Sequence, residues 1–430
     1  MEIKSQDNIR TLLAGITLPR MMRVRQHFPD ARIEDVEGCI RAKLREQGLA
    51  SRISPGMRVV LTGGSRGIAN IAVILREVAA FVKECGAVPV IVPAMGSHGG
   101  STAEGQRQIL TEYGITEELC GCEIVASMET VVTGHTQDGH PVYLDKYAHE
   151  ADAIIPVGRI KPHTAFRGPY ESGLMKMLGI GLGKQKGADS LHNEGFGVFR
   201  ERIPAFGQVI MDTNNVIFGA GLIENAYEHT CRIEVVKGEE IAEKEPPLLE
   251  FAKAQMARIL FPETDILVVR EIGKNISGSG MDPNITGTFS TPYAQGGIRK
   301  QRTVVLDLTE ESHGNAIGVG KSDTTTMRMF NKIDFTTLYP NMLTSTVVAP
   351  GVIPMVMEDD KMAIEAAIKI CTGVDKEKIR IVVIKNTLCM EEIMISETML
   401  EEAEKTEGIE MLEAPRAFRF DGNGNLLDLK

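Results

Sequence analysis

Two consecutive strand–loop–helix units near the N-terminus constrain the fold more than any other feature of the sequence. The segment MRVVLTGGSRGIANIAVILREVAAFVKECGA (57–87) contains a β-branched run, a glycine-rich loop and a helix whose apolar residues recur at helical spacing. The segment VPVIVPAMGSHGGSTAEGQ (88–106) repeats the strand and the glycine-rich loop, and begins another helix. Strands that alternate with helices predict mostly parallel, Rossmann-like sheets covered on both faces, and therefore an α/β protein.

The rest of the chain continues this alternation. Further strands are predicted at DAIIPVG (152–158), NNVIFGAGL (214–222), DILVVREIG (265–273), RTVVLDLT (302–309), STVVAPGVIP (345–354) and IRIVVIKNTL (379–388). The first ~50 residues have a helical composition, and the charged segment 238–264 predicts a connecting helix. We expect two α/β domains, residues 1–260 and 261–430, with an active-site cleft between them.

Three short motifs predict local structure. Gly86 predicts the end of the helix before it. The sequence STAE predicts a capping box in which Ser101 caps the next helix. The sequence GHTQDGHP favours a β-hairpin turn over a metal site made of His135 and His140.

Composition excludes several classes of protein. A formal net charge of -11 argues against nucleic-acid binding, because phosphate contacts need clustered lysine and arginine. No apolar run reaches the roughly 18 residues that cross a bilayer, and the N-terminus has no apolar signal region. Seven scattered cysteines indicate reduced thiols and a cytoplasmic protein.

Polar side chains follow three of the predicted strands. Arg66 follows the first strand, His98 the second and His163 the third. The carboxyl ends of adjacent parallel strands lie at one sheet edge, where ligands bind, so these side chains are expected to converge. Histidine both takes and gives protons near pH 7, and two of them on opposite sides of one carbon suit a racemase or epimerase.

A second candidate feature is the glycine-dotted stretch after His163. It contains Lys176, Lys184, Lys186 and His192. A buried lysine can act as a nucleophile or a covalent anchor when its pKa is lowered. Composition alone does not choose among the three lysines.

Taken together, these motifs resemble the nickel-dependent lactate racemase family. The resemblance runs from about Arg58 into the C-terminal half and rests on GGSRG, MGSHGGST, KPHTAF, SGLMK and SLHNEG. It implies a nickel pincer cofactor of the pyridinium-3,5-bisthiocarboxylic acid mononucleotide type, covalently held by a lysine. It also implies cofactor-biosynthesis and nickel-insertion enzymes as partners.

The resemblance assigns roles to particular residues. His98 and His163 match the two acid/base positions, Lys176 matches the tethering lysine, and His192 matches the protein's nickel ligand. Arg66, with Ser65 and Gly64, matches the loop near the cofactor phosphate, and the arginine also lies near the substrate carboxylate in that family. The implied reaction inverts the C2 hydroxyl carbon of a 2-hydroxy acid by proton-coupled hydride transfer to the pincer. Residues 1–260 would hold the cofactor and 261–430 would close over the substrate.

Two departures from the family pattern bear on these assignments. The interval from His163 to Lys176 is longer than in the lactate enzyme, which keeps Lys184 and Lys186 as rival tethers. The C-terminal loop lacks the family's Gln and Lys pair, so Lys274 and Asn275, with Asp282 and Asn284 nearby, become the candidate substrate residues. This polar loop favours a sugar acid such as gluconate over lactate.

Two other classes of function stay open at the level of sequence. A cofactor-free two-base epimerase or lyase would use the same histidines without metal. A non-catalytic sugar-acid-binding protein would use the loops only to hold a ligand. The sequence does not indicate an oligomeric state.

Overall fold

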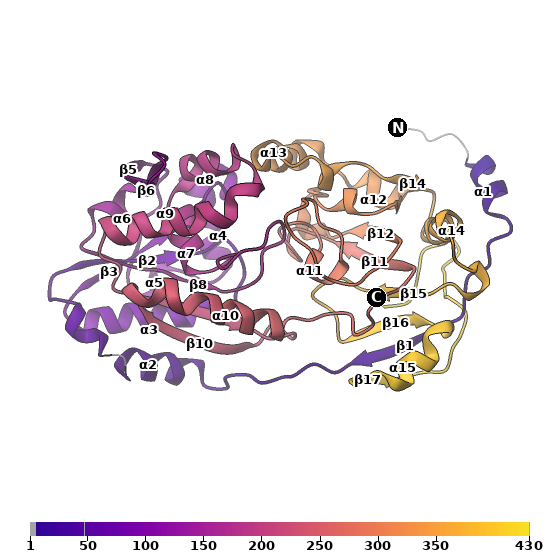
Figure 1. The fold of residues 1–430 in the computed structure, drawn as a ribbon, viewed down its shortest axis with the longest axis horizontal. Coiled ribbons are helices and arrows are strands. Elements are labelled where there is room, and N and C mark those ends of the chain that lie inside the picture. The colour runs from indigo at the N-terminus through magenta and orange to yellow at the C-terminus, as the bar shows by residue number, and fades with distance from the viewer. Residues whose placement is uncertain (1–5, 47, 430) are drawn as a thin grey trace. The chain divides into compact units, whose positions relative to one another are not determined.

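The computed structural model describes residues 6–46 and 48–429, which form two compact units (Figure 1). The N-terminal unit is Pro29–Met256. The C-terminal unit combines Ala257–Lys430 with the start of the chain up to Phe28. Among the described residues, no helix combines the length and the apolar character that crossing a membrane requires.

The described residues of the N-terminal unit contain nine strands of varied length that belong to three sheets. Its strands are β2 Arg58–Gly63, β3 Val88–Pro93, β4 Glu123–Ile124, β5 Thr130–His135, β6 Pro141–Asp145, β7 Ala153–Ile155, β8 Val157–Arg159, β9 Phe218–Glu224 and β10 Thr230–Lys237. Its helices are α2 Val36–Glu46, α3 Ile71–Glu84, α4 Ala103–Glu112, α5 Glu117–Cys120, α6 Lys146–Glu150, α7 Leu174–Lys176, α8 Lys184–His192, α9 Phe199–Thr213 and α10 Ile241–Gln255.

The central sheet of this unit is parallel and has the order β4-β3-β2-β7. The strand predicted at 152–158 divides at Pro156, which has no N–H to donate to a ladder. β7 pairs with β2, whereas β8 joins a second sheet of order β10-β9-β8. One continuous segment therefore links the two sheets just before it reaches His163.

Alternate residues of β2 face two different helix layers. Val59 and Leu61 belong to a buried cluster with residues of α2 and α3. Val60 belongs to a second cluster with residues of α7, α8 and α9. The ribbon shows α2 and α3 on one side of β2 and α9 on the other (Figure 1). A strand buried on both faces explains the continuous apolar run in the sequence.

The C-terminal unit is built on one mixed sheet of order β14-β13-β12-β11-β15-β16-β1-β17. Its strands are β1 Met21–Gln26, β11 Ile266–Ile272, β12 Arg302–Leu308, β13 Thr324–Thr326, β14 Met355–Met357, β15 Ile381–Ile384, β16 Glu392–Ser396 and β17 Ile409–Met411. The first five in sheet order are parallel, and the remaining pairings are antiparallel. Its helices are α1 Asp7–Leu13, α11 Pro283–Thr286, α12 Met327–Asn331, α13 Phe335–Ser345, α14 Asp360–Ile370 and α15 Leu400–Lys405.

The start of the chain differs from the sequence-based expectation. Residues 21–26 form β1, which pairs with β16 and β17, so a purely helical N-terminus was wrong. This strand packs with the C-terminal half, whereas the predicted boundary placed all of 1–260 in one domain. A strand finds its partners through backbone hydrogen bonds, and those partners lie more than 350 residues away.

Two smaller predictions are also corrected. The segment 345–354 is not a strand, because α13 continues to Ser345 and a 3₁₀ turn follows at Ala349–Gly351. The cap of α4 is Thr102, whose side chain accepts a hydrogen bond from the Gly105 N–H, and not Ser101. The other two local predictions are confirmed, since Gly86 has a φ of +78° just after α3 and residues 130–145 form the β5-β6 hairpin.

Candidate active site

Three loops at the carboxyl edge of the central sheet of the N-terminal unit form the candidate site. β2 lies between β3 and β7, and all three strands run parallel. The loops after β2 and β3 carry Arg66 and His98, and the segment from β7 through β8 leads to His163. This strand order agrees with the prediction that the side chains after the three strands lie at one edge of the sheet.

The first loop contacts the second directly. The Ser65 hydroxyl and His98 Nδ1 form a hydrogen bond of 2.5 Å. Arg66 folds back so that its guanidinium donates to the Ser65 carbonyl at 3.0 Å, and the Tyr113 hydroxyl donates to the same oxygen at 3.4 Å. Burial lowers the pKa of Arg66, and the guanidinium stays charged because arginine does not lose its proton in proteins. The loop after β2 therefore orients one histidine and brings a cation beside it.

Glycines let the second loop turn back tightly after β3. Gly96, Gly99 and Gly100 have φ values of +58°, +69° and +62°, which side chains rarely adopt. A Cβ on Gly99 would lie 2.7 Å from the Gln106 backbone N, so no larger residue fits there. The buried Gln106 amide donates to the carbonyls of Gly96 and His98, at 2.9 and 3.2 Å. These bonds fix the backbone that carries His98.

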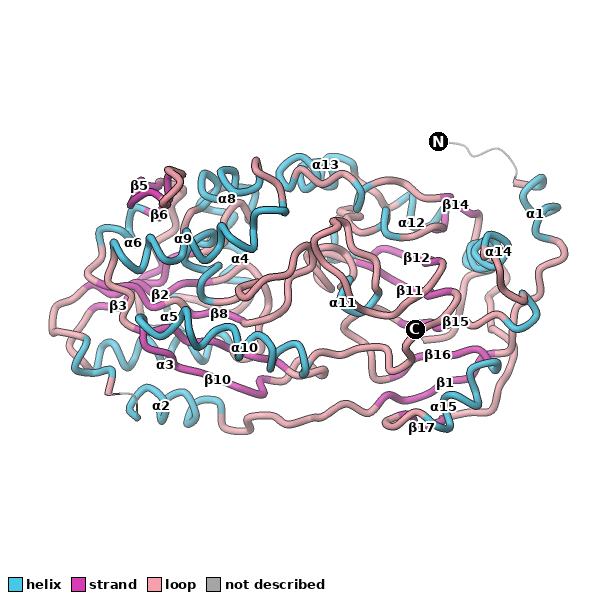
Figure 2. Tube along the Cα trace, in the orientation of Figure 1, coloured by secondary structure: helices cyan, strands magenta, loops and turns pink. Residues whose placement is uncertain are grey.

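The third loop, residues 160–173 between β8 and α7, is long but tied at its base (Figure 2). A bridge pairs Lys161 with Ser172. The fully buried Glu171 carboxylate accepts from the His163 N–H at 2.7 Å and from Arg167 at 3.2 Å. His163 Nδ1 in turn accepts from the Ala165 N–H at 3.1 Å. The loop holds this imidazole in one orientation.

Electrostatics keep the His163 ring neutral. Burial is the largest cause that lowers its pKa well below 6.5, and the nearby Lys176 ammonium is the next. Because Nδ1 accepts a hydrogen bond, the neutral ring carries its proton on Nε2. At neutral pH the His163 ring is therefore a hydrogen-bond donor at Nε2.

Lys176, at the end of α7, combines burial with the lack of a partner. Burial lowers its pKa to about 7, and the charge of Arg66 contributes to this shift. In the described parts of the chain, its ammonium forms no hydrogen bond and no ion pair. A lysine with such a pKa is largely available as a free amine near pH 7, which is the state that reacts with electrophiles.

His192, at the end of α8, has a buried nitrogen without a partner. Its Nδ1 lies out of contact with solvent and forms no hydrogen bond. The ring packs against Phe196 and Phe199, with centroids 5.2 and 5.1 Å away. Burial lowers its pKa to about 4, and Lys176 adds to the effect. A neutral imidazole with an unsatisfied nitrogen is a suitable metal ligand.

The two rival lysines occupy different environments. Lys184 is fully buried and ion-paired with the equally buried Asp145 at 3.2 Å, and its ammonium also donates to the Pro93 carbonyl. Lys186 is exposed on α8. Lys184 thus stabilises the contact between α8 and β3, and the geometry favours Lys176 as the reactive lysine of this stretch.

The candidate substrate residues of the later loop lie in the C-terminal unit. Lys274 follows β11, and its ammonium donates to the Gly278 carbonyl and the Asn341 side chain, at 2.9 and 2.7 Å. Asn275 accepts a hydrogen bond from the Thr309 hydroxyl at 2.7 Å. Asp282 caps α11 by accepting from the Asn284 N–H. Their role in substrate binding stays a prediction.

Two buried acids that position the site were not predicted from the sequence. Glu171 lies between glycines in the PYESGLMK segment, and an acid in such an apolar stretch was a usable signal. Glu245 comes from α10 and accepts a hydrogen bond from the Met175 N–H at 2.9 Å, which holds the start of the helix that carries Lys176. In the sequence it resembles its exposed neighbours, and only the fold shows that it is buried.

The burial of Glu245 leads to a prediction about how the stability of the protein depends on pH. Burial raises the pKa of this carboxyl from 4.5 to about 7. Between these values the folded chain holds a proton that the unfolded chain has lost, so the free energy of unfolding falls as pH rises through this window. Glu245→Gln keeps the hydrogen-bond acceptor and removes the titration. Urea unfolding across this pH window is expected to show a shallower decline for this variant than for the wild type.

A control for this prediction is Glu250→Gln, because Glu250 is 70% exposed on the same helix. This variant is expected to keep the wild-type pH dependence. A Glu245→Gln variant whose stability declines as steeply as that of the wild type would show that Glu245 does not bind the extra proton.

The fold and the site define an α/β protein that carries two histidines and an arginine on loops at one sheet edge. Residues 21–199 match the family model described as lactate racemase N-terminal domain. This match confirms the resemblance seen in the sequence. A comparison with curated protein sequences gives no match.

One solved structure supports the fold. The structure of the lactate racemase apoprotein from Thermoanaerobacterium thermosaccharolyticum matches with a TM-score of 0.50 and 16% identity, over 86% of this chain and 99% of that chain. The crystal structure of a Thermotoga maritima protein matches with a TM-score of 0.47 and 14% identity, over 65% of this chain and 72% of that chain. The predicted α/β class is confirmed, with mixed and parallel sheets as in the lactate racemase apoprotein.

Proposed function

We propose that this protein is a racemase or epimerase that inverts the hydroxyl-bearing C2 of a 2-hydroxy acid, with a nickel-pincer nucleotide as its cofactor. One observation carries the proposal: Lys176, which has no partner among the described residues, and His192, which has an unsatisfied buried nitrogen, lie within electrostatic reach of His163. Lys176 lowers the pKa of both His163 and His192, so the three groups are within electrostatic reach of one another.

The residues present fit such a cofactor. Lys176 would hold it covalently through its amine, and His192 would supply a nitrogen to nickel. The described residues contain no group of three or more His, Cys, Asp or Glu able to hold a metal, so the other nickel ligands would belong to the cofactor. Arg66, which lowers the pKa of Lys176, would neutralise a phosphate or carboxylate. When bound, the cofactor supplies a hydride acceptor.

The two histidines move the protons of the reaction. We assign to His98 the tautomer whose Nδ1–H donates to the Ser65 oxygen, so that its unprotonated Nε2 can take the substrate hydroxyl proton. His163 would take up a proton from water and deliver it, as an imidazolium, to the oxygen of a 2-keto acid. Covalent attachment of Lys176 would remove the ammonium charge that lowers the pKa of His163, which favours this protonated form. After one inversion both rings exchange protons with water and return to their starting states. In the reverse direction the two roles are exchanged.

The chain's own groups cannot perform the inversion by direct deprotonation of carbon. The C2 hydrogen lies beside an ionised carboxylate, and an imidazole of ordinary pKa 6.5 is far too weak a base to remove it as a proton. The pKa of His163 is lower still, which weakens it further as a base. This argues for hydride transfer and against the cofactor-free two-base epimerase.

The proposal is tested by chiral chromatography of 2-hydroxy acids incubated with protein from a host that makes the cofactor. Lactate, malate, 2-hydroxyglutarate and gluconate cover short, acidic and sugar-acid substrates. Inversion of one of them, lost when nickel is removed, is the expected result, and a sugar acid is the expected substrate. Inversion by protein free of nickel would favour the cofactor-free epimerase, and ligand binding without turnover would favour a binding protein.

The assignment of His192 leads to a separate prediction. His192→Ala is expected to lose bound nickel while the covalent adduct on Lys176 stays, because the lysine bond does not depend on the imidazole. Nickel per adduct, measured by elemental analysis and intact mass, is expected to fall to a small fraction of the wild-type ratio. The exposed hairpin residue provides a matched control as His135→Ala. A wild-type nickel ratio in His192→Ala would exclude His192 as a ligand.

A further inference from the structure

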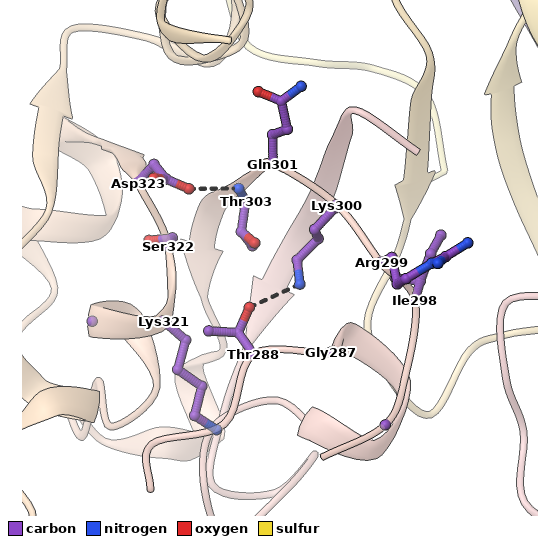
Figure 3. A pocket seen from close by; sticks show the side chains of 12 residues that line it. Gly287, Thr288, Ile298, Arg299, Lys300, Gln301, Thr303, Lys321, Ser322 and Asp323 are labelled. Atoms are coloured by element: carbon purple, nitrogen blue, oxygen red, sulfur yellow. Dashed lines mark hydrogen bonds between the residues drawn. The ribbon is translucent and has the colours of Figure 1, made fainter. Parts of the chain in front are cut away.

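A pocket of about 500 Å³ lies in the C-terminal unit (Figure 3). It is lined by residues 287–288, 296, 298–301, 303 and 320–323. These segments precede β12 and β13, which are parallel, so the pocket lies at the amino edge of this part of the sheet. Lys274 follows β11 at the opposite, carboxyl edge. The pocket therefore opens at a different edge of this sheet from Lys274, although the Lys321 side chain reaches the loop after β11 that carries Lys274 and Asp282.

Two lysines of the lining have no acidic partner. The Lys300 ammonium donates to the Thr288 hydroxyl at 2.8 Å and to the Thr286 carbonyl. The Lys321 ammonium donates to the carbonyls of Ser279 and Met281, at 2.9 and 3.2 Å, and this residue is 5% exposed. Neither lysine forms an ion pair with any acid in the described ranges 6–46 and 48–429.

The acid in the lining does not balance these charges. The Asp323 carboxylate is engaged by Arg302 at 3.2 Å and by the Thr303 N–H at 2.8 Å. Figure 3 shows this bond to Thr303 and the separate bond from Lys300 to Thr288. Asp323 and Asp282 lie within electrostatic reach of Lys300 and Lys321, respectively. The hydrogen bonds of both ammonium groups nevertheless go to neutral oxygens, an arrangement that costs free energy unless an anion completes it.

We propose that this pocket binds a compact oxyanion, a phosphate or a carboxylate, between Lys300 and Lys321. Each ammonium has three donors and uses two, so each has one donor left for a ligand oxygen. The volume falls in the range of small-molecule sites, which leaves room for a short organic residue attached to the anion. This proposal does not depend on the proposed function.

The protonation of the two lysines supports the proposal. Burial lowers the pKa of Lys300 to about 8 and that of Lys321 to about 7. A bound anion favours the charged form and raises both pKa values, so binding near pH 8 is accompanied by proton uptake. Calorimetry in buffers of different ionisation enthalpy measures this uptake directly.

The test is isothermal titration of the full-length protein with inorganic phosphate and, separately, with gluconate. Lys300→Met and Lys321→Met keep the side-chain length and remove the charge. Each is expected to weaken binding about tenfold or more, as is usual for a lost charged hydrogen bond. Lys405→Met, at a lysine whose side chain is 70% exposed, is expected to bind like the wild type. Lys176→Ala is expected to leave binding at this pocket intact, which separates it from the proposed active site.

Comparing phosphate with gluconate shows whether the pocket binds a phosphate compound or a carboxylate. Saturable phosphate binding that both lysine variants weaken assigns a phosphate compound, and the same result with gluconate alone assigns a carboxylate. Lys300 is only half-buried, so Lys300→Met keeps the test valid if Lys321→Met does not fold. The proposal is overturned if neither ligand binds at millimolar concentration, or if binding is the same in the wild type and in Lys300→Met.

Discussion

Lys176→Ala is expected to remove the covalent cofactor and to reduce racemisation to less than about a thousandth of the wild-type rate. Enzymes accelerate reactions by more than about 10⁶-fold, and the acid/base pair that the variant keeps accounts for only about 10²–10⁴ of that. The physical cause is the amine itself. With a pKa of about 7, roughly half of the Lys176 side chains are neutral at pH 7, against about one in a thousand for a lysine of ordinary pKa.

Intact-mass analysis and peptide mapping of protein from a cofactor-making host measure the adduct. The added mass is expected on the peptide that contains Lys176. Lys186→Ala is the matched control, because this lysine is exposed and lies ten residues further along the chain. Lys184 is unsuitable as a control, since its removal would leave Asp145 buried without its cation. An active Lys176→Ala protein with its adduct on another lysine would exclude the proposed tether.

His98→Asn and His163→Asn are each expected to lower kcat/KM by about 10²–10⁴, the usual contribution of a positioned general acid or base. The equilibrium constant between the two C2 epimers fixes the ratio of kcat/KM in the two directions, so each variant must lower kcat/KM by the same factor in both directions. The effects on kcat and on KM in each direction are free to differ. Initial rates from each epimer, followed by chiral chromatography, measure both.

Measuring the bound cofactor in the two histidine variants distinguishes a chemical role of each histidine from a structural one. Both variants are expected to keep the Lys176 adduct and the nickel ratio of the wild type, because neither histidine is assigned to the cofactor. His135→Asn, on the exposed hairpin, is expected to have the wild-type rate. A His98→Asn or His163→Asn protein with full cofactor and nearly full activity would remove that residue from the mechanism.

The pattern of strands, glycines and helices predicted the part of the site that depends on local structure. Because β2, β3 and β7 are parallel strands of one sheet, the polar residues after them were expected at one edge of the sheet, and the strand order agrees. The glycines around His98 were expected to allow a close turn, and their positive φ values show it. The capping residue of α4 was off by one position, because Ser101 has a φ of +58° whereas Thr102 has the extended backbone that an N-cap needs.

The sequence pattern could not predict which strands pair when they lie far apart in the chain. β1 has the length and composition of many exposed segments, and it becomes a strand only because β16 and β17 lie beside it. The division of the third strand at Pro156 also depends on two different sheets, one on each side of it. Glu245 could not be distinguished from the neighbouring surface acids until α10 packed it against the start of α7.

The sequence by itself determined the α/β class, the loops that carry the histidines and the set of three candidate lysines, because these follow from residue periodicity and from the chemistry of each side chain. Only the tertiary structure decided among the lysines. Asp145 neutralises Lys184, solvent surrounds Lys186, and Lys176 is half-buried and has no partner among the described residues. The reactivity of an amine depends on its surroundings in space, which are brought together from distant parts of the chain.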